Sequence, residues 1–112
     1  MALGLRYLGH REGASLAYFT GASVDLVIGQ IFDVPPEGRR VGRRATASLR
    51  IASSQVSPHG ALLTPCEDGI LLDDRTSPNA TLVNGRIERR AVLRCGDVVA
   101  FAGAFDFEIV EL

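Results

Sequence analysis

Apolar and polar residues follow one another along this chain in a pattern that is typical of short β-strands. Runs of β-branched and aromatic residues end in Gly, Pro, Asn or Asp about every ten residues, which is typical of strands separated by turns. Apolar residues three and four positions apart are nowhere sustained over three helical turns, so the pattern predicts little or no helix. The expected strands are Leu3–Leu8, Ser15–Phe19, Val24–Ile28, Gln30–Val34, Arg40–Val41, Ser48–Ile51, Ala61–Thr64, Ile70–Asp73, Thr81–Val83, Ala91–Leu93, Val98–Phe101 and Asp106–Val110.

Strands at this spacing satisfy their backbone groups by passing back and forth between two sheets. The expected fold is therefore all-β, a two-sheet antiparallel β-sandwich of about 11 strands. The turn Pro35-Pro36-Glu37-Gly38 ends one strand, because proline cannot donate to a β-ladder. Asn84-Gly85 is the strongest hairpin signal, since a tight type I′ turn needs positive φ at both central residues.

The composition is that of one globular domain. The chain has 112 residues, of which 46% are apolar and 22% charged, and a chain of this length buries a core without metal or disulfides. The net charge of −1 argues against a nucleic-acid binder, because such proteins carry a large positive excess.

The basic residues are unevenly distributed along the chain. All twelve are arginines, and five fall close together: Arg39, Arg40, Arg43, Arg44 and Arg50. Arginine presents a planar fork of donors that suits phosphate or carboxylate. The alternative explanation is that these arginines are only solvated residues of an exposed loop. The absence of lysine would then reflect genome composition.

Reactive and metal-binding patterns are missing from the sequence. Cys66 and Cys95 have neither CxxC spacing nor the histidines of a zinc site, so we expect two reduced thiols and no metal or cofactor. No apolar run approaches the roughly 20 residues of a membrane span, and the N-terminus lacks signal-peptide order, which predicts a cytoplasmic protein. Ser57 beside His59 lacks a third orienting group, and we expect no enzymatic activity.

Four motifs then occur in order from Gly29 to the C-terminus. Val41-Gly42-Arg43 comes first, and Ser57 follows fourteen positions after Arg43. Ser77-Pro78-Asn79-Ala80-Thr81-Leu82-Val83-Asn84-Gly85 comes next, and Gly96-Asp97 is the last. In this order and spacing the chain resembles a forkhead-associated (FHA) domain, an FHA/SMAD-like β-sandwich that binds phosphothreonine peptides through loops at one end.

The resemblance implies a role for three residues. Arg43 would contact the phosphate, with a charge-assisted and bidentate geometry available to its guanidinium. Ser57 would donate its hydroxyl to a second phosphate oxygen. Asn79 would hold the main chain of the ligand through its side-chain amide. Each has a structural alternative, in which Arg43 is solvated, Ser57 caps its own turn and Asn79 stabilises its loop.

Four positions depart from the family pattern. Without a gap, Pro58 stands where the family has a further arginine, and Gly60 where it has a histidine that braces the serine loop. A shift of one residue would put His59 in that place instead. In the third motif, Pro78 replaces a common threonine and Ala80 replaces a glycine. Arg44, His59 or Arg75 could compensate for the lost positive charge, and Pro78 is a further supporting candidate at the binding rim.

Residues 1–28 are expected to form an N-terminal strand extension packed on the same domain, with residues 29–112 as the sandwich. Their apolar runs Leu5–Leu8 and Leu16–Phe19 predict a hairpin around His10–Ala14, which would add strands to a sheet edge or offer that edge to a partner or second copy. In a competing register, Gly29-Gln30 replaces Gly42-Arg43 as the glycine-arginine pair, at the cost of a long insertion before Ser57.

The sequence therefore predicts a non-enzymatic protein-interaction module that binds a phosphothreonine-containing protein or peptide. The alternative is a degenerate FHA-like domain that assembles with a partner or with itself independently of phosphate. Neither hypothesis includes nucleic acid or membrane insertion, and both place the protein in the cytoplasm.

Overall fold

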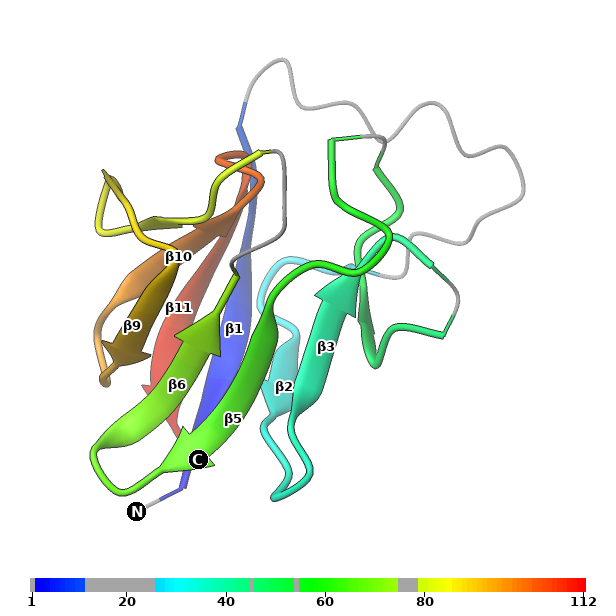
Figure 1. Cartoon of the computed structure of the whole chain (residues 1–112). Coiled ribbons are helices and arrows are strands. Elements are labelled where there is room, and N and C mark those ends of the chain that lie inside the picture. Colours follow the sequence, from blue (N-terminus) through cyan, green and yellow to red (C-terminus); the bar gives the residue numbers. More distant parts are fainter. Residues whose placement is uncertain (1, 12–25, 45, 54, 75–78) are drawn as a thin grey trace.

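In the computed structural model, the described part of the chain forms eleven strands in two sheets that face each other (Figure 1). The structure describes residues 2–11, 26–44, 46–53, 55–74 and 79–112. One sheet has six strands in the order β2-β1-β11-β10-β7-β8 and the other has five in the order β4-β3-β5-β6-β9. The strand bounds are Leu3–His10 (β1), Ile31–Asp33 (β2), Arg39–Gly42 (β3), Leu49–Arg50 (β4), Leu62–Cys66 (β5), Gly69–Asp73 (β6), Leu82–Val83 (β7), Arg86–Ile87 (β8), Arg90–Leu93 (β9), Val98–Phe101 (β10) and Phe105–Glu111 (β11).

The predicted all-β sandwich is confirmed, and the described residues contain no helix. The core lies between the sheets because the strands alternate buried and less buried positions, most regularly in β6 and β11. The six-stranded sheet contributes Leu5 and four aromatic residues, Tyr7, Phe101, Phe105 and Phe107. The other sheet contributes aliphatic residues: Val41, Leu63, Ile70, Leu72 and Leu93.

The Asn84-Gly85 hairpin is also confirmed. Asn84 has φ 50° and Gly85 φ 82°, and the flanking strands pair Leu82 with Ile87 and Val83 with Arg86. Both central residues therefore lie in the positive-φ region that a tight hairpin requires.

One pair of strands departs from the antiparallel prediction. β3 and β4 run parallel, with Val41 opposite Leu49 and Gly42 opposite Arg50. Ser48 accounts for this: its Oγ accepts a hydrogen bond from the Arg40 backbone N at 3.0 Å, and its carbonyl accepts one from Arg39 Nη1 at 2.8 Å. The segment after β3 therefore comes back to the start of β3, and β4 then runs beside β3 in the same direction.

The N-terminal strand does not lie at a sheet edge. β1 pairs with β11 on one side and with β2 on the other, which corrects the expectation for this part of residues 1–28. Residues 26–28 are not a strand, and the Gln30 N to Val27 O bond closes a turn over residues 27–30. The predicted strand Ser15–Phe19 and its hairpin fall outside the described residues. The domain boundary at residue 28 stays a prediction.

Arg39 joins the two sheets along their β2–β3 side. Its Nη2 donates to Asp33 Oδ1 at 2.5 Å, and its Nε donates to the Asp33 carbonyl. The guanidinium also lies 5.7 Å from the centre of the Phe32 ring. One side chain of β3 therefore binds the edge strand of the opposite sheet, and it covers a carbonyl that would otherwise be open to another strand.

We expect Arg39→Ala to lower the free energy of unfolding by about 2 kcal/mol, because hydrogen bonds to a charged group and a stacked ring are lost together. Urea denaturation followed by circular dichroism measures the loss. Arg6→Ala is the matched control, since the Arg6–Glu108 pair is exposed and such pairs contribute about 1 kcal/mol or less. Equal losses in the two variants would contradict a sheet-joining role for Arg39.

Candidate functional site

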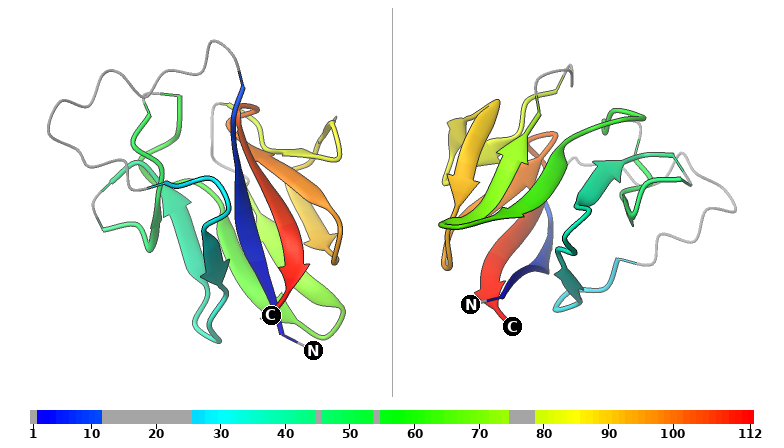
Figure 2. Two further views of the ribbon diagram at one scale, coloured as in Figure 1. Left: turned by 180° about the vertical axis from the view of Figure 1, so that it is seen from behind. Right: turned by 60° about the horizontal axis from the view of Figure 1, so that its bottom comes forward.

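The loops that follow β3, β4 and β6 gather at the end of the sandwich opposite the two chain termini (Figures 1 and 2). We call this the loop end, and its described segments are 43–44, 46–48, 51–53, 55–61 and 79–81. All three residues predicted to contact a ligand, Arg43, Ser57 and Asn79, lie in it.

Gly42 lets the end of β3 pass directly beneath the Ser57 loop. A Cβ at this position would lie 2.5 Å from the Pro58 carbonyl oxygen, a distance that real Cβ atoms do not reach. The next residue then pairs with the loop, because the Arg43 backbone N donates to the Ser57 carbonyl at 3.0 Å. Pro58 is thus part of a close backbone approach.

The arginines of the loop end have no carboxylate partner within the described structure. Arg43 is half-buried, and its carbonyl accepts a hydrogen bond from Arg50 Nε at 3.0 Å. Arg44 is exposed in a turn that the Ala47 N to Arg44 O bond closes at 3.0 Å. Arg6, Arg11 and Arg39, by contrast, each pair with an acidic side chain on another part of the sandwich. Arg43 and Arg44 therefore place positive charge at the loop end without a carboxylate partner among the described residues.

The Ser57 hydroxyl is engaged within its own loop. It donates to the His59 carbonyl at 3.2 Å, so a phosphate oxygen would have to replace that carbonyl as its acceptor. The His59 side chain is exposed, and Gly60 is buried. The loop is held instead by Arg40, whose Nη1 donates to the Gly60 carbonyl at 3.1 Å. Sequence reasoning placed Arg40 in the arginine cluster but did not single out this brace.

Asn79 connects two loops of the site. Its Nδ2 donates to the Gln55 carbonyl at 2.8 Å, which ties the segment before β7 to the loop after β4. The side chain is exposed, and no described residue bonds its Oδ1. Arg75 and Pro78, the other two residues predicted at this rim, fall outside the described residues.

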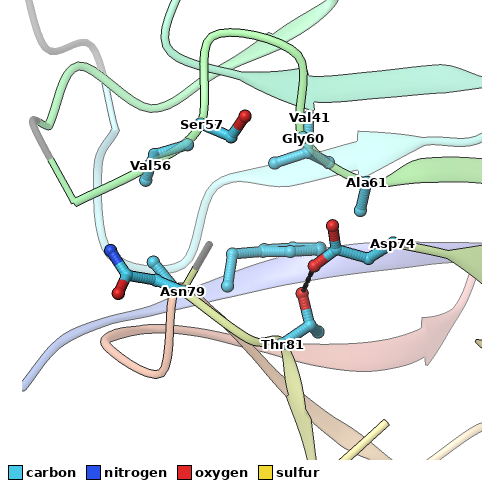
Figure 3. A pocket seen from close by; sticks show the side chains of 10 residues that line it. Val41, Val56, Ser57, Gly60, Ala61, Asp74, Asn79 and Thr81 are labelled. Carbon is cyan, nitrogen blue, oxygen red and sulfur yellow. Dashed lines mark hydrogen bonds between the residues drawn. The ribbon is translucent and has the colours of Figure 1, made fainter. Parts of the chain in front are cut away.

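A small cavity of about 10 Å³ lies between Ser57 and Asn79 (Figure 3). Its walls are mostly apolar, from Val41, Val56 and Phe101. Two buried polar residues, Asp74 and Thr81, also line it, and the Thr81 hydroxyl donates to Asp74 Oδ2. Neither was singled out from the sequence, where Asp74 is one of two adjacent acids and Thr81 one residue of a motif.

A larger hollow of about 460 Å³ lies near the chain termini, with Leu3, Val34, Ile70 and Leu112 in its lining. Its charged wall residue is Asp33, and its lining includes neither arginine nor histidine. A phosphate group would find no cation there, so the loop end is the better candidate for binding an anion.

Within the described ranges, no three or more His, Cys, Asp and Glu side chains are grouped so that they could hold a metal ion. A helix long and apolar enough to cross a membrane is also absent from that part of the chain.

Comparison with known families now identifies the fold. The family model for the FHA domain matches residues 39–102, more than half of the chain. The chain belongs to the FHA domain family. The match includes Gly42-Arg43 and begins after Gly29-Gln30.

A curated relative of this FHA domain is the ABC transporter ATP-binding/permease protein Rv1747 of Mycobacterium tuberculosis, which is 37% identical over 67 residues. The match covers 60% of this chain but 8% of the transporter, so the chain spans a small part of that relative.

Two solved structures share the fold. The FHA domain of the CT664 protein of Chlamydia trachomatis is 22% identical, with a TM-score of 0.73 over 100% of this chain and 99% of that one. Mycobacterium tuberculosis EmbR, solved with a low-affinity phosphopeptide, is 20% identical, with a TM-score of 0.71 over 97% of this chain and 24% of EmbR. FHA domains are interaction modules rather than enzymes, and membership supports a phosphoprotein-interaction module here.

Proposed function

We propose that this FHA domain binds a phosphothreonine-containing segment of a partner protein at its loop end and that its role is not enzymatic. The observation that carries the proposal is the convergence of Arg43, Ser57 and Asn79. The Arg43 N to Ser57 O bond and the Asn79 to Gln55 O bond hold their three segments together. EmbR, which shares the fold, was solved with a phosphopeptide.

The chemistry of the three side chains suits a phosphorylated peptide. A phosphothreonine carries about −1.5 to −2 charges and three acceptor oxygens. The Arg43 guanidinium, which pairs with no described carboxylate, supplies charge-assisted donors, and the Ser57 hydroxyl supplies one more when it leaves the His59 carbonyl. Asn79 keeps its Oδ1 for a backbone N–H of the ligand while its Nδ2 remains on Gln55. Arg44 and His59, both exposed at the same rim, add further side chains that can donate hydrogen bonds.

Calorimetric titration with a library of short phosphothreonine peptides tests the proposal. We expect the best member to bind with a Kd on the order of micromolar, as for small transient interfaces. The same peptide without phosphate should bind at least about tenfold more weakly, because each lost charge-assisted bond is worth about 1.5–3 kcal/mol. Equal binding of both forms, or binding of neither, would contradict the proposal.

A second candidate function is phosphate-independent assembly with a protein partner or a second copy. The Ser57 hydroxyl already has an acceptor in its own loop, and Val27 and Ile28 are 65% and 72% exposed on the turn before β2. Apolar side chains grouped on a surface suit a protein contact. Sedimentation velocity of the unliganded domain tests self-association, and a pull-down with unphosphorylated lysate tests a partner; a monomer that captures nothing would count against this function.

We further propose a cytoplasmic location and a role in signalling. Cys66 and Cys95 are both free and exposed, as expected for thiols kept in a reducing compartment.

A further inference from the structure

The buried carboxylate of Asp74 has only one of its two oxygens satisfied. Asp74 is 2% exposed directly after β6, and its Oδ2 accepts the hydroxyl hydrogen of Thr81, which is 1% exposed. Its Oδ1 is buried and bonds to no described residue. Buried polar atoms are almost always hydrogen-bonded, since leaving one unpaired costs free energy. This oxygen therefore points to a donor from outside the protein.

The place for that donor is the small cavity that Asp74 lines. In Figure 3 one carboxylate oxygen bonds Thr81 while the other points toward Gly60 and Ala61, across the cavity. The cavity volume of about 10 Å³ fits one water molecule. A buried water needs two to four polar partners, and Asp74 Oδ1 faces the Gly60–Ala61 backbone, which carries N–H and C=O groups. A metal ion is not the expected occupant, because the described chain groups no three metal-ligating side chains.

Asp74 and Thr81 also stand at the two ends of the loop that carries Asn79. The Asp74 N donates to the Arg89 carbonyl at 2.7 Å, and the Thr81 carbonyl accepts from the Glu88 N at 3.0 Å. The side-chain bond between Asp74 and Thr81 closes the loop across its base. It also connects the two sheets, because Asp74 follows β6 of one sheet and Thr81 precedes β7 of the other.

We propose that Asp74 binds one buried water molecule beneath the loop end and that, through this water and Thr81, it positions the Asn79 loop against the Ser57 loop. Asp74 is a positioning residue, since it lies beneath the rim and touches no ligand. The effect on ligand affinity rests on the proposed phosphothreonine binding, whereas the water and the loop anchor do not.

The first test needs no ligand. A high-resolution crystal structure of the unliganded domain is expected to show a water within hydrogen-bond distance of Asp74 Oδ1. Hydrogen exchange of the Asp74 and Glu88 amides then reports on the loop base. We expect Thr81→Val to accelerate both about tenfold and Thr81→Ser, which keeps the hydroxyl, to restore protection. Ile70→Val, a conservative change to a core residue of β6, is the control and should leave both rates unchanged.

The second test measures affinity for the tightest phosphothreonine peptide of the library above. Asp74→Ala is expected to weaken binding about tenfold or more, and Asp74→Asn, which keeps an acceptor for Thr81 and a polar group in the cavity, to recover most of it. If Asp74→Ala does not fold, Thr81→Val and Thr81→Ser replace this pair. A crystal structure without the water, or rescue variants that behave like the disrupting ones, would overturn the proposal. If the wild type binds no phosphopeptide, the proposed function fails while the water and exchange tests still decide the role of Asp74.

Discussion

Arg43→Ala is expected to weaken binding of the phosphothreonine peptide by about 30-fold or more while leaving the fold unchanged. Truncating one partner of a hydrogen-bonded charge pair costs about 2–5 kcal/mol, and each 1.4 kcal/mol is a factor of about ten in Kd. The side chain of Arg43 has no partner in the described structure, so its removal leaves no described buried group unpaired. Calorimetry measures the change in Kd, and thermal unfolding checks that stability is retained.

Two variants make this result specific to Arg43. Arg94→Ala removes an exposed arginine from the turn between β9 and β10, on the side of the chain termini, and should leave Kd unchanged (Figure 1). Gln30→Ala addresses the register in which Gly29-Gln30 replaces Gly42-Arg43. Loss of affinity in Gln30→Ala with none in Arg43→Ala would assign the phosphate contact to that other register.

Gly42→Ala is expected to lower both stability and affinity. The added Cβ would lie 2.5 Å from the Pro58 carbonyl oxygen, and because that neighbour is backbone, the Ser57 loop itself must move. Overpacking of this kind costs about 1–3 kcal/mol in the free energy of unfolding. The displaced loop carries the carbonyl that accepts from the Arg43 N, so we expect the phosphothreonine peptide to bind about tenfold more weakly. Urea denaturation and calorimetry measure the two effects.

Gly96→Ala is the control variant that separates a loss of stability from damage to the binding site. Gly96 has φ 93° in the turn before β10, and a Cβ there would meet no atom within 4 Å. The alanine is therefore strained by its backbone conformation, at a cost of about 1–2 kcal/mol, without displacing a neighbour. We expect Gly96→Ala to be less stable but to bind the peptide normally. If Gly42→Ala binds as tightly as Gly96→Ala, the close approach at Pro58 does not position the site.

The Asn84-Gly85 turn of this fold could be predicted from the conformational preferences of its own residues. Asn84-Gly85 predicts a tight hairpin because both residues tolerate positive φ, and the structure has both there. β4 is different: it is two residues long and parallel to β3, and its course depends on Ser48 being held by Arg39 and Arg40. Strand propensity over two residues is too weak to indicate such a pairing.

The candidate site also has a part that the sequence predicted and a part that only the structure showed. Arg43, Ser57 and Asn79 were identified by motif and spacing, and the structure places them in neighbouring loops, while their contact with a ligand stays a prediction. Pro58 and Gly60 lack the arginine and histidine side chains of the family pattern, yet the Pro58 carbonyl packs over Gly42 and the Gly60 carbonyl is bonded by Arg40. Both roles use backbone atoms, which residue identity does not reveal.

By itself, the sequence determined that this chain is an all-β sandwich with FHA motifs and an arginine-rich loop, because alternation, turn residues and motif spacing act over short distances along the chain. Only the tertiary structure decided that Arg39 joins the sheets, that the Ser57 hydroxyl already has an acceptor, and that Asp74 is buried with one oxygen unpaired. These properties depend on which segments meet across the sandwich, and burial removes the water that would otherwise satisfy each polar group.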